Sequence, residues 1–130
     1  MSKREFTILT DVSMITCIVQ RGKADKVVRA AQEAGAAGAT IYFGNGSGVR
    51  ETLGLLELTV DVEKEIITTL VADDAVDRIF ERMFFAGELD VPGGGIIYIT
   101  KLEKMAMYIP QDVLARLSSG GGAGASRESA

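Results

Sequence analysis

Two strand–helix–strand units follow one another along this chain, and a glycine-rich segment accompanies each of them. In the first unit, residues 14–19 form a short, apolar, β-branched run that is typical of a buried strand. Apolar side chains then recur at helical spacing within residues 23–34, and Gly35 stands where a left-handed helix terminus favours glycine. Residues 39–43 return to strand composition and run into the loop Gly-Asn-Gly-Ser-Gly, residues 44–48. The first unit is therefore predicted as strand, helix, strand and glycine loop.

The second unit has a helix with a broader apolar face. Residues 65–71 have strand composition, and Asp73 or Asp74 is expected to cap the next helix by accepting backbone N–H bonds. Gly87 is expected to end that helix. Its apolar stripe, at positions i, i+3, i+4, i+7 and i+8, consists of Val76, Ile79, Phe80, Met83 and Phe84. A second glycine loop then leads into residues 96–100, which are a strand by composition.

Two such units predict an α+β fold, the ferredoxin-like double βαβ sandwich, in which a four-stranded antiparallel sheet carries two helices on one face. The other face would stay partly apolar. Its expected apolar residues are Ile66, Leu70, Ile97 and Ile99. Because an uncovered apolar sheet promotes aggregation, we expect copies of the chain to cover it. Between the two units, residues 49–62 mix leucines with charged residues and fit either a hairpin or a partner-facing loop.

The chain has 130 residues, a length typical of one domain. We expect a folded domain over residues 1–117 and a flexible tail over residues 118–130, because the tail is rich in Gly, Ser and Ala and offers nothing to bury. The net charge is −4, and the 14 basic and 18 acidic residues alternate in sign, which argues against a nucleic-acid partner. No apolar stretch has the length of a membrane span and none has the pattern of a signal peptide. A cytoplasmic protein without direct membrane insertion is therefore expected.

Composition also argues against catalysis and metal binding. Histidine is absent, which removes the commonest general base and the commonest metal ligand. The acidic residues Glu81, Glu88 and Asp90 lack metal-ligand spacing, and we interpret them as surface residues. The single cysteine, Cys17, lies in an apolar run and is interpreted as core packing. No catalytic residue, metal site or catalytic cofactor is predicted, and we do not expect an enzyme.

The two glycine loops are the candidate binding elements. Without a Cβ atom, their backbone N–H groups can approach phosphate or carboxylate oxygens closely. The first loop matches neither the dinucleotide fingerprint nor the Walker A spacing. The cations nearest to the strand ends that carry these loops are Lys64, Arg50, Lys101 and Lys104. The pattern leaves two interpretations open, a small-anion site or two purely structural turns.

In their order and spacing, these elements resemble the PII signal-transduction family and its PII-like relatives. The similarity covers about residues 13–108. It rests on the stretch from Ala39-Thr40-Ile41 to Gly46-Ser47-Gly48, on Leu70-Val71-Ala72-Asp73-Asp74, and on Pro92 to Tyr98. The resemblance implies a homotrimer whose sheets face inward, with ATP or ADP clefts between neighbouring subunits. It also implies a loop after the second strand that contacts partner proteins.

The resemblance and the glycine loops together define the predicted binding residues. By resemblance, the nucleotide cleft is lined by Thr40, Gly46, Gly48, Lys64 and Gly94. The glycine-loop argument adds Gly44, Ser47, Gly93 and Gly95. Residues 49–62 correspond to the family's partner-binding loop, in a shorter form. The expected partner contacts within it are Arg50, Glu51, Leu53, Leu55 and Leu56.

Three of the family's cations are missing at the matching positions. Gly95 replaces its phosphate-contacting lysine, and Ala106 and Tyr108 replace a pair of arginines. If each charge-assisted contact contributes about 1.5 to 3 kcal/mol, their loss weakens triphosphate binding by several orders of magnitude unless another cation compensates. No tyrosine occurs in residues 44–97, so regulation by uridylylation is not expected.

The leading hypothesis is a divergent PII-like regulator. A small anionic effector, such as ATP, ADP, AMP or another metabolite, would bind between subunits and order residues 49–62, and the regulated partner would be a membrane transporter or an enzyme. One rival is a structural oligomer, or a binding module for a ligand that is not a nucleotide. The other is an enzyme on the same scaffold, for which Glu51 near Lys64 is the only candidate pair.

Overall fold

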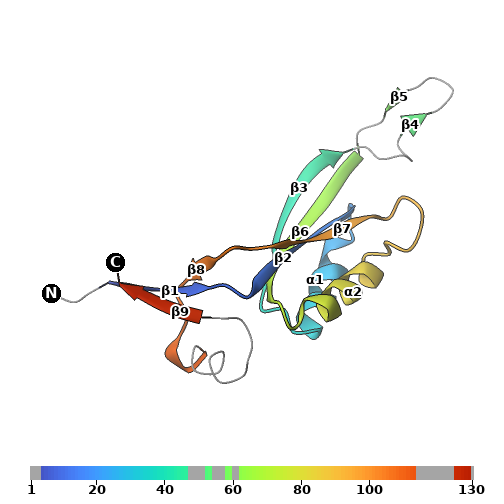
Figure 1. Cartoon of the computed structure of the whole chain (residues 1–130). Helices are drawn as coiled ribbons and strands as arrows, with labels where there is room; N and C mark the ends of the chain where they lie inside the picture. The colour runs from blue at the N-terminus through green and yellow to red at the C-terminus, as the bar shows by residue number, and fades with distance from the viewer. Residues whose placement is uncertain (1–3, 47–51, 54–57, 60–61, 114–124, 130) are drawn as a thin grey trace.

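The computed structural model describes residues 4–46, 52–53, 58–59, 62–113 and 125–129. Its main body is a four-stranded antiparallel sheet in the order β3-β6-β2-β7, with two helices on one face (Figure 1). The elements of this body are β2 (Val12–Gln20), α1 (Ala24–Glu33), β3 (Thr40–Gly46), β6 (Val62–Ala72), α2 (Val76–Ala86) and β7 (Gly95–Lys101). The predicted α+β fold, a ferredoxin-like double βαβ sandwich, is confirmed.

The core lies between the sheet and the two helices. Ile15, Cys17 and Val19 alternate along β2 and are fully buried, as the period of two in a strand requires. Across this layer, α1 contributes Val27 and α2 contributes Met83, and both side chains are also fully buried.

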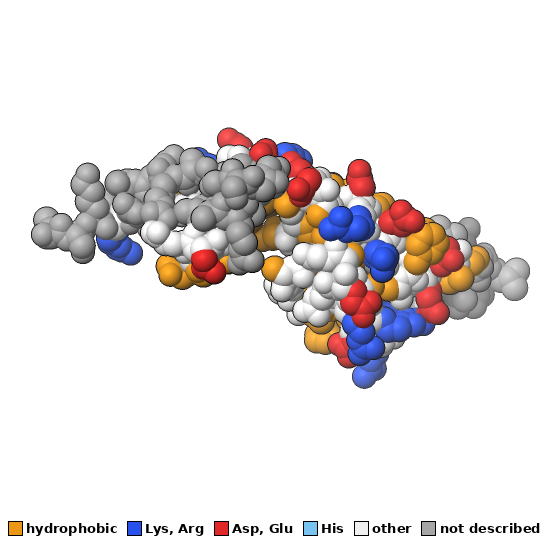
Figure 2. All heavy atoms as spheres, turned by 90° about the horizontal axis from the view of Figure 1, so that it is seen from below, with side chains coloured by type: hydrophobic (Ala, Val, Ile, Leu, Met, Phe, Trp, Pro, Cys, Tyr) orange, Lys and Arg blue, Asp and Glu red, His pale blue; other side chains and the backbone are white. Residues whose placement is uncertain are grey.

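Charged residues of both signs intermix over the side of the molecule shown in Figure 2, with no large area of one sign.

The helix ends follow the predictions only in part. Gly35 follows α1 with a φ of 117°, as predicted for a left-handed terminus. After α2, however, the left-handed residue is Glu88, with a φ of 58°, while Gly87 keeps a helical φ of −81°. A Cβ at Gly87 would lie 3.1 Å from Val19 Cγ1 and 3.2 Å from Val27 Cγ2, so close packing accounts for this glycine.

The predicted aspartate cap of α2 is wrong. The helix begins after Ala75 and receives no side-chain hydrogen bond at that end. Instead, the carboxylate of Asp73 accepts a hydrogen bond from Ser13 Oγ at 2.7 Å and pairs with Lys101 Nζ at 2.9 Å. The sequence did not show this because Ser13 and Lys101 approach Asp73 only in the folded sheet.

No helix among the described residues covers the second face of the sheet, and this face is partly apolar. Residues that pair directly across neighbouring strands point to the same side, so the register assigns each side chain to a face. Ile97 and Ile99 pair with Cys17 and Ile15, which places them on the helix side and corrects the prediction for these two residues. The large apolar residues left exposed on the open face are Tyr42 (49%), Leu70 (44%), Ile96 (56%) and Tyr98 (44%).

A second, smaller sheet adjoins the main body on the side away from β4 and β5 (Figure 1). It consists of β8 (Met105–Met107), β1 (Glu5–Leu9) and β9 (Ala125–Ser129), in the order β8-β1-β9. Neither β1 nor β9 was predicted, because β9 is polar and β1 is a short strand whose partners lie far along the chain. Residues 125–129 of the expected flexible tail therefore form a strand, and residues 118–124 lie outside the described part. The division of the chain at residue 117 stays a prediction.

Lys101 fixes the junction between the two sheets. Its Nζ donates hydrogen bonds to the carbonyl oxygens of Thr10 at 2.7 Å and Val12 at 3.1 Å, in addition to its ion pair with Asp73. The backbone adds a further contact, because Leu102 N donates to Val12 O at 3.2 Å. The connection from β1 to β2, the turn before α2 and the end of β7 are thus joined by one lysine.

Candidate functional site

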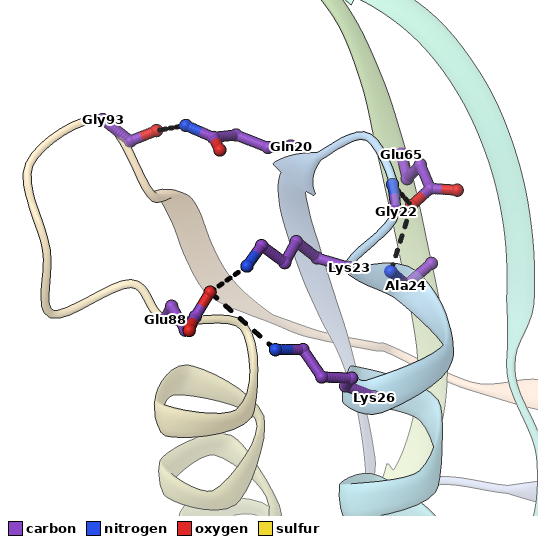
Figure 3. Close-up of polar contacts among 8 residues, drawn as sticks. All are labelled: Gln20, Gly22, Lys23, Ala24, Lys26, Glu65, Glu88 and Gly93. Carbon is purple, nitrogen blue, oxygen red and sulfur yellow. Dashed lines mark hydrogen bonds and ion pairs between the residues drawn. The ribbon is translucent and has the colours of Figure 1, made fainter.

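Both glycine segments lie at the same end of the main sheet, which we call the glycine end. Here β3 and β2 finish, while β6 and β7 begin. Gly44 pairs with Lys64 across β3 and β6, and Lys64 pairs with Gln20 across β6 and β2. Gln20 Nε2 then donates a 2.6 Å hydrogen bond to the carbonyl of Gly93 (Figure 3). A continuous row of residues therefore connects the two segments.

Within one chain, however, the two segments are too far apart to share a small ligand. β3 and β7 are the two edge strands, and β6 and β2 lie between them. Three strand spacings of about 4.8 Å give a separation of about 14 Å. A single small anion that contacts both segments must therefore use glycine segments from two different copies of the chain.

The second glycine segment is tightly constrained by its neighbours. A Cβ on Gly94 would overlap the carbonyl oxygen of Glu88, and a Cβ on Gly95 would overlap the carbonyl oxygen of Ile18. Gly95 also has a φ of 138°, which an L side chain rarely adopts. The backbone therefore requires glycine at the position where the resemblance would place a lysine.

The first glycine segment differs from its prediction as a loop. Gly44 and Gly46 belong to strand β3, and Ser47 and Gly48 lie outside the described residues. A Cβ on Gly46 would meet Lys64 Cγ at 3.7 Å, so the lysine stem passes over this glycine. Thr40 begins β3, six residues before Gly46 and about 20 Å away at about 3.3 Å per residue. The structure thus brings together Gly44, Gly46 and Lys64 but not Thr40.

Two of the cations expected near the glycine loops, which would have to compensate for the three missing ones, lie at the opposite end of the sheet. Lys101 ends β7 and is held by Asp73, and Lys104 follows it in the connection to β8. Arg50 lies outside the described residues. Neither lysine can compensate at the glycine end of its own chain.

Sequence reasoning missed a group of cations that does lie at the glycine end. Lys23 and Lys26, at the start of α1, both pair with the carboxylate of Glu88, and the Lys26 Nζ distance is 3.8 Å (Figure 3). Arg21 pairs with Glu63 at 3.7 Å. The lysines and Glu88 are more than 60 positions apart in the chain, so no local motif reveals them.

Carboxylates elsewhere at this end organise the backbone. Glu65 Oε1 accepts hydrogen bonds from the backbone N–H groups of Gly22 at 2.6 Å and Ala24 at 3.1 Å, and so satisfies donors at the start of α1 (Figure 3). Hydrogen bonding from Lys23, together with the charges of Lys23 and Lys26, holds the pKa of Glu88 below its ordinary value. Both carboxylates are therefore suited to holding the start of α1 in place.

The single cysteine is suited to packing. Cys17 is fully buried, and burial raises the pKa of its thiol to about 12. A thiol with so high a pKa carries almost no thiolate at neutral pH and is a poor nucleophile.

Among the described residues, no group of three or more acidic or cysteine side chains is placed to hold a metal ion. No helix in the described part has the length and apolar composition needed to cross a membrane.

The expected partner-binding segment is described only in part. Leu53 belongs to β4 (Thr52–Leu53), which pairs antiparallel with β5 (Leu58–Thr59). This pairing agrees with the hairpin alternative for residues 49–62. Arg50, Glu51, Leu55 and Leu56 lie outside the described residues, so their predicted role as partner contacts stays a prediction.

A hollow of about 510 Å³ lies on the small sheet. Phe6, Met107 and Tyr108 line it, together with Ala106 and the polar side chains of Thr7 and Gln111. Tyr108 is 84% exposed. Ala106 and Tyr108 are the positions at which the resemblance would place arginines, and none of the described lining residues carries a positive charge.

Comparison with known proteins identifies the family. The sequence model of the nitrogen regulatory protein P-II matches residues 12–110, most of the chain. This protein belongs to the P-II family. The match includes the main sheet, both helices and β8, while β1 and β9 lie outside it. The suspected family resemblance is confirmed.

Two solved structures share the fold of this P-II protein. One is the PII protein of Arabidopsis thaliana bound to citrate, with a TM-score of 0.58, 18% sequence identity, and coverage of 72% of this chain and 79% of that chain. The other is the GlnK–ATP complex of B. subtilis, with a TM-score of 0.59, 16% identity, and coverage of 71% of this chain and 82% of that chain. At this level of identity, they establish the P-II fold alone.

Proposed function

We propose that this P-II family member is a non-catalytic regulator that binds a small anionic effector in clefts between the subunits of a homotrimer. The observation that carries the proposal is the position of the two glycine segments, at one end of the sheet but on opposite edge strands. Their separation within one chain favours a pocket that a neighbouring subunit completes.

The open face of the sheet supports association. Four large apolar side chains on it are 44–56% exposed, and no helix among the described elements covers that face. Burying such a face between copies removes apolar surface from water, which is the main favourable contribution to association of this kind. A trimer with inward-facing sheets would satisfy this requirement in each subunit.

The chemistry of the site favours an effector of modest negative charge. The related structures were solved with ATP and with citrate, so both anions are reasonable probes. In this chain, Gly95 cannot carry a lysine without strain, and Ala106 and Tyr108 bring no cation. Compared with a cleft that has all three cations, this cleft should bind every anion more weakly. We expect the loss of affinity to be larger for ATP than for AMP, ADP or a carboxylate.

The proposed output is a change in residues 49–62. Effector binding beside Gly44 and Gly46 would act on this segment because it directly follows β3. A partner protein in the cytoplasm, either a membrane transporter or an enzyme, would recognise the changed segment. The effect requires different effector affinities for the two conformations of that segment.

Two measurements test the proposal. Light scattering on a sizing column should give the mass of a trimer, and isothermal titration with ATP, ADP, AMP, cyclic AMP, bicarbonate and citrate should give saturable binding for at least one anion. A monomer, or no binding across the whole panel, would refute it.

A structural oligomer is the rival that the tight packing of Gly94 and Gly95 favours, because those glycines are required by the fold alone. Thermal unfolding separates the two, since a ligand that binds the native state raises the melting temperature. An enzyme is the other rival, and loss of a measurable activity in Glu51→Ala would support it.

A further inference from the structure

Glu88 connects the second glycine segment to the start of α1. It is the first residue after Gly87, at the beginning of the loop that leads to Gly93. Its carboxylate pairs with Lys23 and, at 3.8 Å, with Lys26. The side chain of Lys23 is only 29% exposed, so its pairing with Glu88 is partly shielded from water. The ammonium groups of Lys23 and Lys26 are therefore paired with a carboxylate that belongs to the loop carrying the glycines.

The backbone of Glu88 sets the position of the glycines. Glu88 is the one described non-glycine residue with a positive φ, at 58°. Its carbonyl accepts a hydrogen bond from Val91 N at 3.4 Å, and the carbonyl of Val91 accepts one from Gly94 N at 3.1 Å. Gly94 packs so closely against the Glu88 carbonyl that no Cβ fits between them. The backbones of Glu88 and Gly94 are therefore in direct contact.

The lysines are linked to this loop through Glu88, which pairs with both of them, and through Gln20. Lys23 N donates a 3.2 Å hydrogen bond to the carbonyl of Gln20, and the side chain of Gln20 holds the carbonyl of Gly93 at 2.6 Å. Figure 3 shows two separate contacts, one between Gln20 and Gly93 and the other between Glu88 and the two lysines. Glu88 pairs with both lysines and its carbonyl contacts Gly94, so an anion that took the place of the Glu88 carboxylate beside Gly94 would meet the same two lysines.

We propose that Glu88 is an internal anion that competes with the effector for Lys23 and Lys26. The proposal rests on the proposed function, because it concerns the regulation of the same site. A phosphate or carboxylate group of the effector replaces the Glu88 carboxylate on the lysines. Release of Glu88 then frees the loop to Gly94 from α1, so that effector binding changes the conformation of the glycine segment.

The test is a set of charge variants titrated with ATP and, separately, with citrate at low salt. Glu88→Gln removes the competing charge and should raise the affinity for both anions about 10-fold, whereas Lys23→Met should lower it by about the same factor. Glu81→Gln makes the same charge change at an exposed position on α2 and should leave the affinity within about twofold of wild type. Hydrogen exchange of residues 88–94 should also be faster in Glu88→Gln.

A second variant guards against misfolding. Glu88→Gly also removes the carboxylate, and glycine adopts a φ of 58° without strain, so this variant should fold and should bind both anions more tightly. If Glu88→Gln and Lys23→Met change the affinity in the same direction, the ion pair is only a structural clamp and the competition is refuted. If wild type and every variant fail to bind both anions, the proposed function fails, and this inference fails with it.

Discussion

Alanine at Gly95 should destabilise the protein far more than alanine at other glycines. Gly95 combines a φ of 138° with a backbone contact to Ile18 that leaves no space for a Cβ. Gly22 has a φ of 91° but nothing within 4 Å of its Cβ position, so it isolates the effect of backbone conformation. Gly38 has neither feature and serves as the neutral control. The three positions separate strain from steric overlap.

The expected sizes follow from these differences. Gly38→Ala should be neutral or should stabilise by about 0.4 to 1 kcal/mol, because alanine restricts the unfolded chain. Gly22→Ala should cost about 1 to 2 kcal/mol for the left-handed backbone alone. Gly95→Ala should cost about 3 kcal/mol, since overpacking adds to the same strain.

Urea unfolding at one fixed protomer concentration measures the difference. With a slope of about 2 kcal/mol per molar urea, the midpoint of Gly95→Ala should fall by about 1.5 M. Gly95→Lys introduces the lysine that the family has at this position. It should be destabilised as strongly as Gly95→Ala and should not bind ATP more tightly than wild type. A Gly95→Ala protein as stable as Gly38→Ala would refute the packing argument.

Three further results are expected. Asp73→Asn should cost about 1 kcal/mol, because it weakens a partly exposed contact with Lys101 and Ser13. Hydrogen bonding from Lys101, and to a smaller extent from Ser13, lowers the pKa of Asp73 in the folded protein. The ionised carboxylate therefore stabilises the fold above the ordinary pKa of 3.8, and this stabilisation is lost as the pH falls through the lower pKa of the folded state. Acid titration of unfolding should therefore show a smaller decline for Asp73→Asn. Ile96→Glu puts a charge on the open face, where Ile96 is 56% exposed, and should dissociate the oligomer on a sizing column, whereas Phe85→Glu on α2, at 57% exposure, should not. Cys17 should resist a thiol reagent in the native protein and react after unfolding, because burial raises the pKa of its thiol to about 12.

The main sheet and both helices could be predicted because their patterns are local. The apolar, β-branched run of residues 14–19 and the apolar stripe from Val76 to Phe84 can each be read within a single element. The face of β7 could not be predicted, because composition does not fix its register against β2, and one step reverses Ile96 and Ile97. Strand β9, Ala-Ser-Arg-Glu-Ser, carries no such pattern, and β1 is a short strand whose partners lie far along the chain.

The candidate site was predicted to a similar extent. Glycine composition singled out Gly93–Gly95, and the resemblance named Lys64 as a residue of the cleft. In the structure, Lys64 pairs with Gly44 across β3 and β6. The pairing of Glu88 with Lys23 and Lys26 was missed, because Glu88 was interpreted as a surface residue and the lysines are distant in sequence. Thr40 was placed in the cleft by resemblance, yet in its own chain it lies at the far end of β3.

A crystal structure with the tightest-binding anion of the panel tests the central claim most directly. The account predicts a trimer in which the anion lies between residues 93–95 of one subunit and the end of β3 of its neighbour. An anion bound wholly within one chain, or a trimer whose contacts leave the open face exposed to solvent, would contradict it.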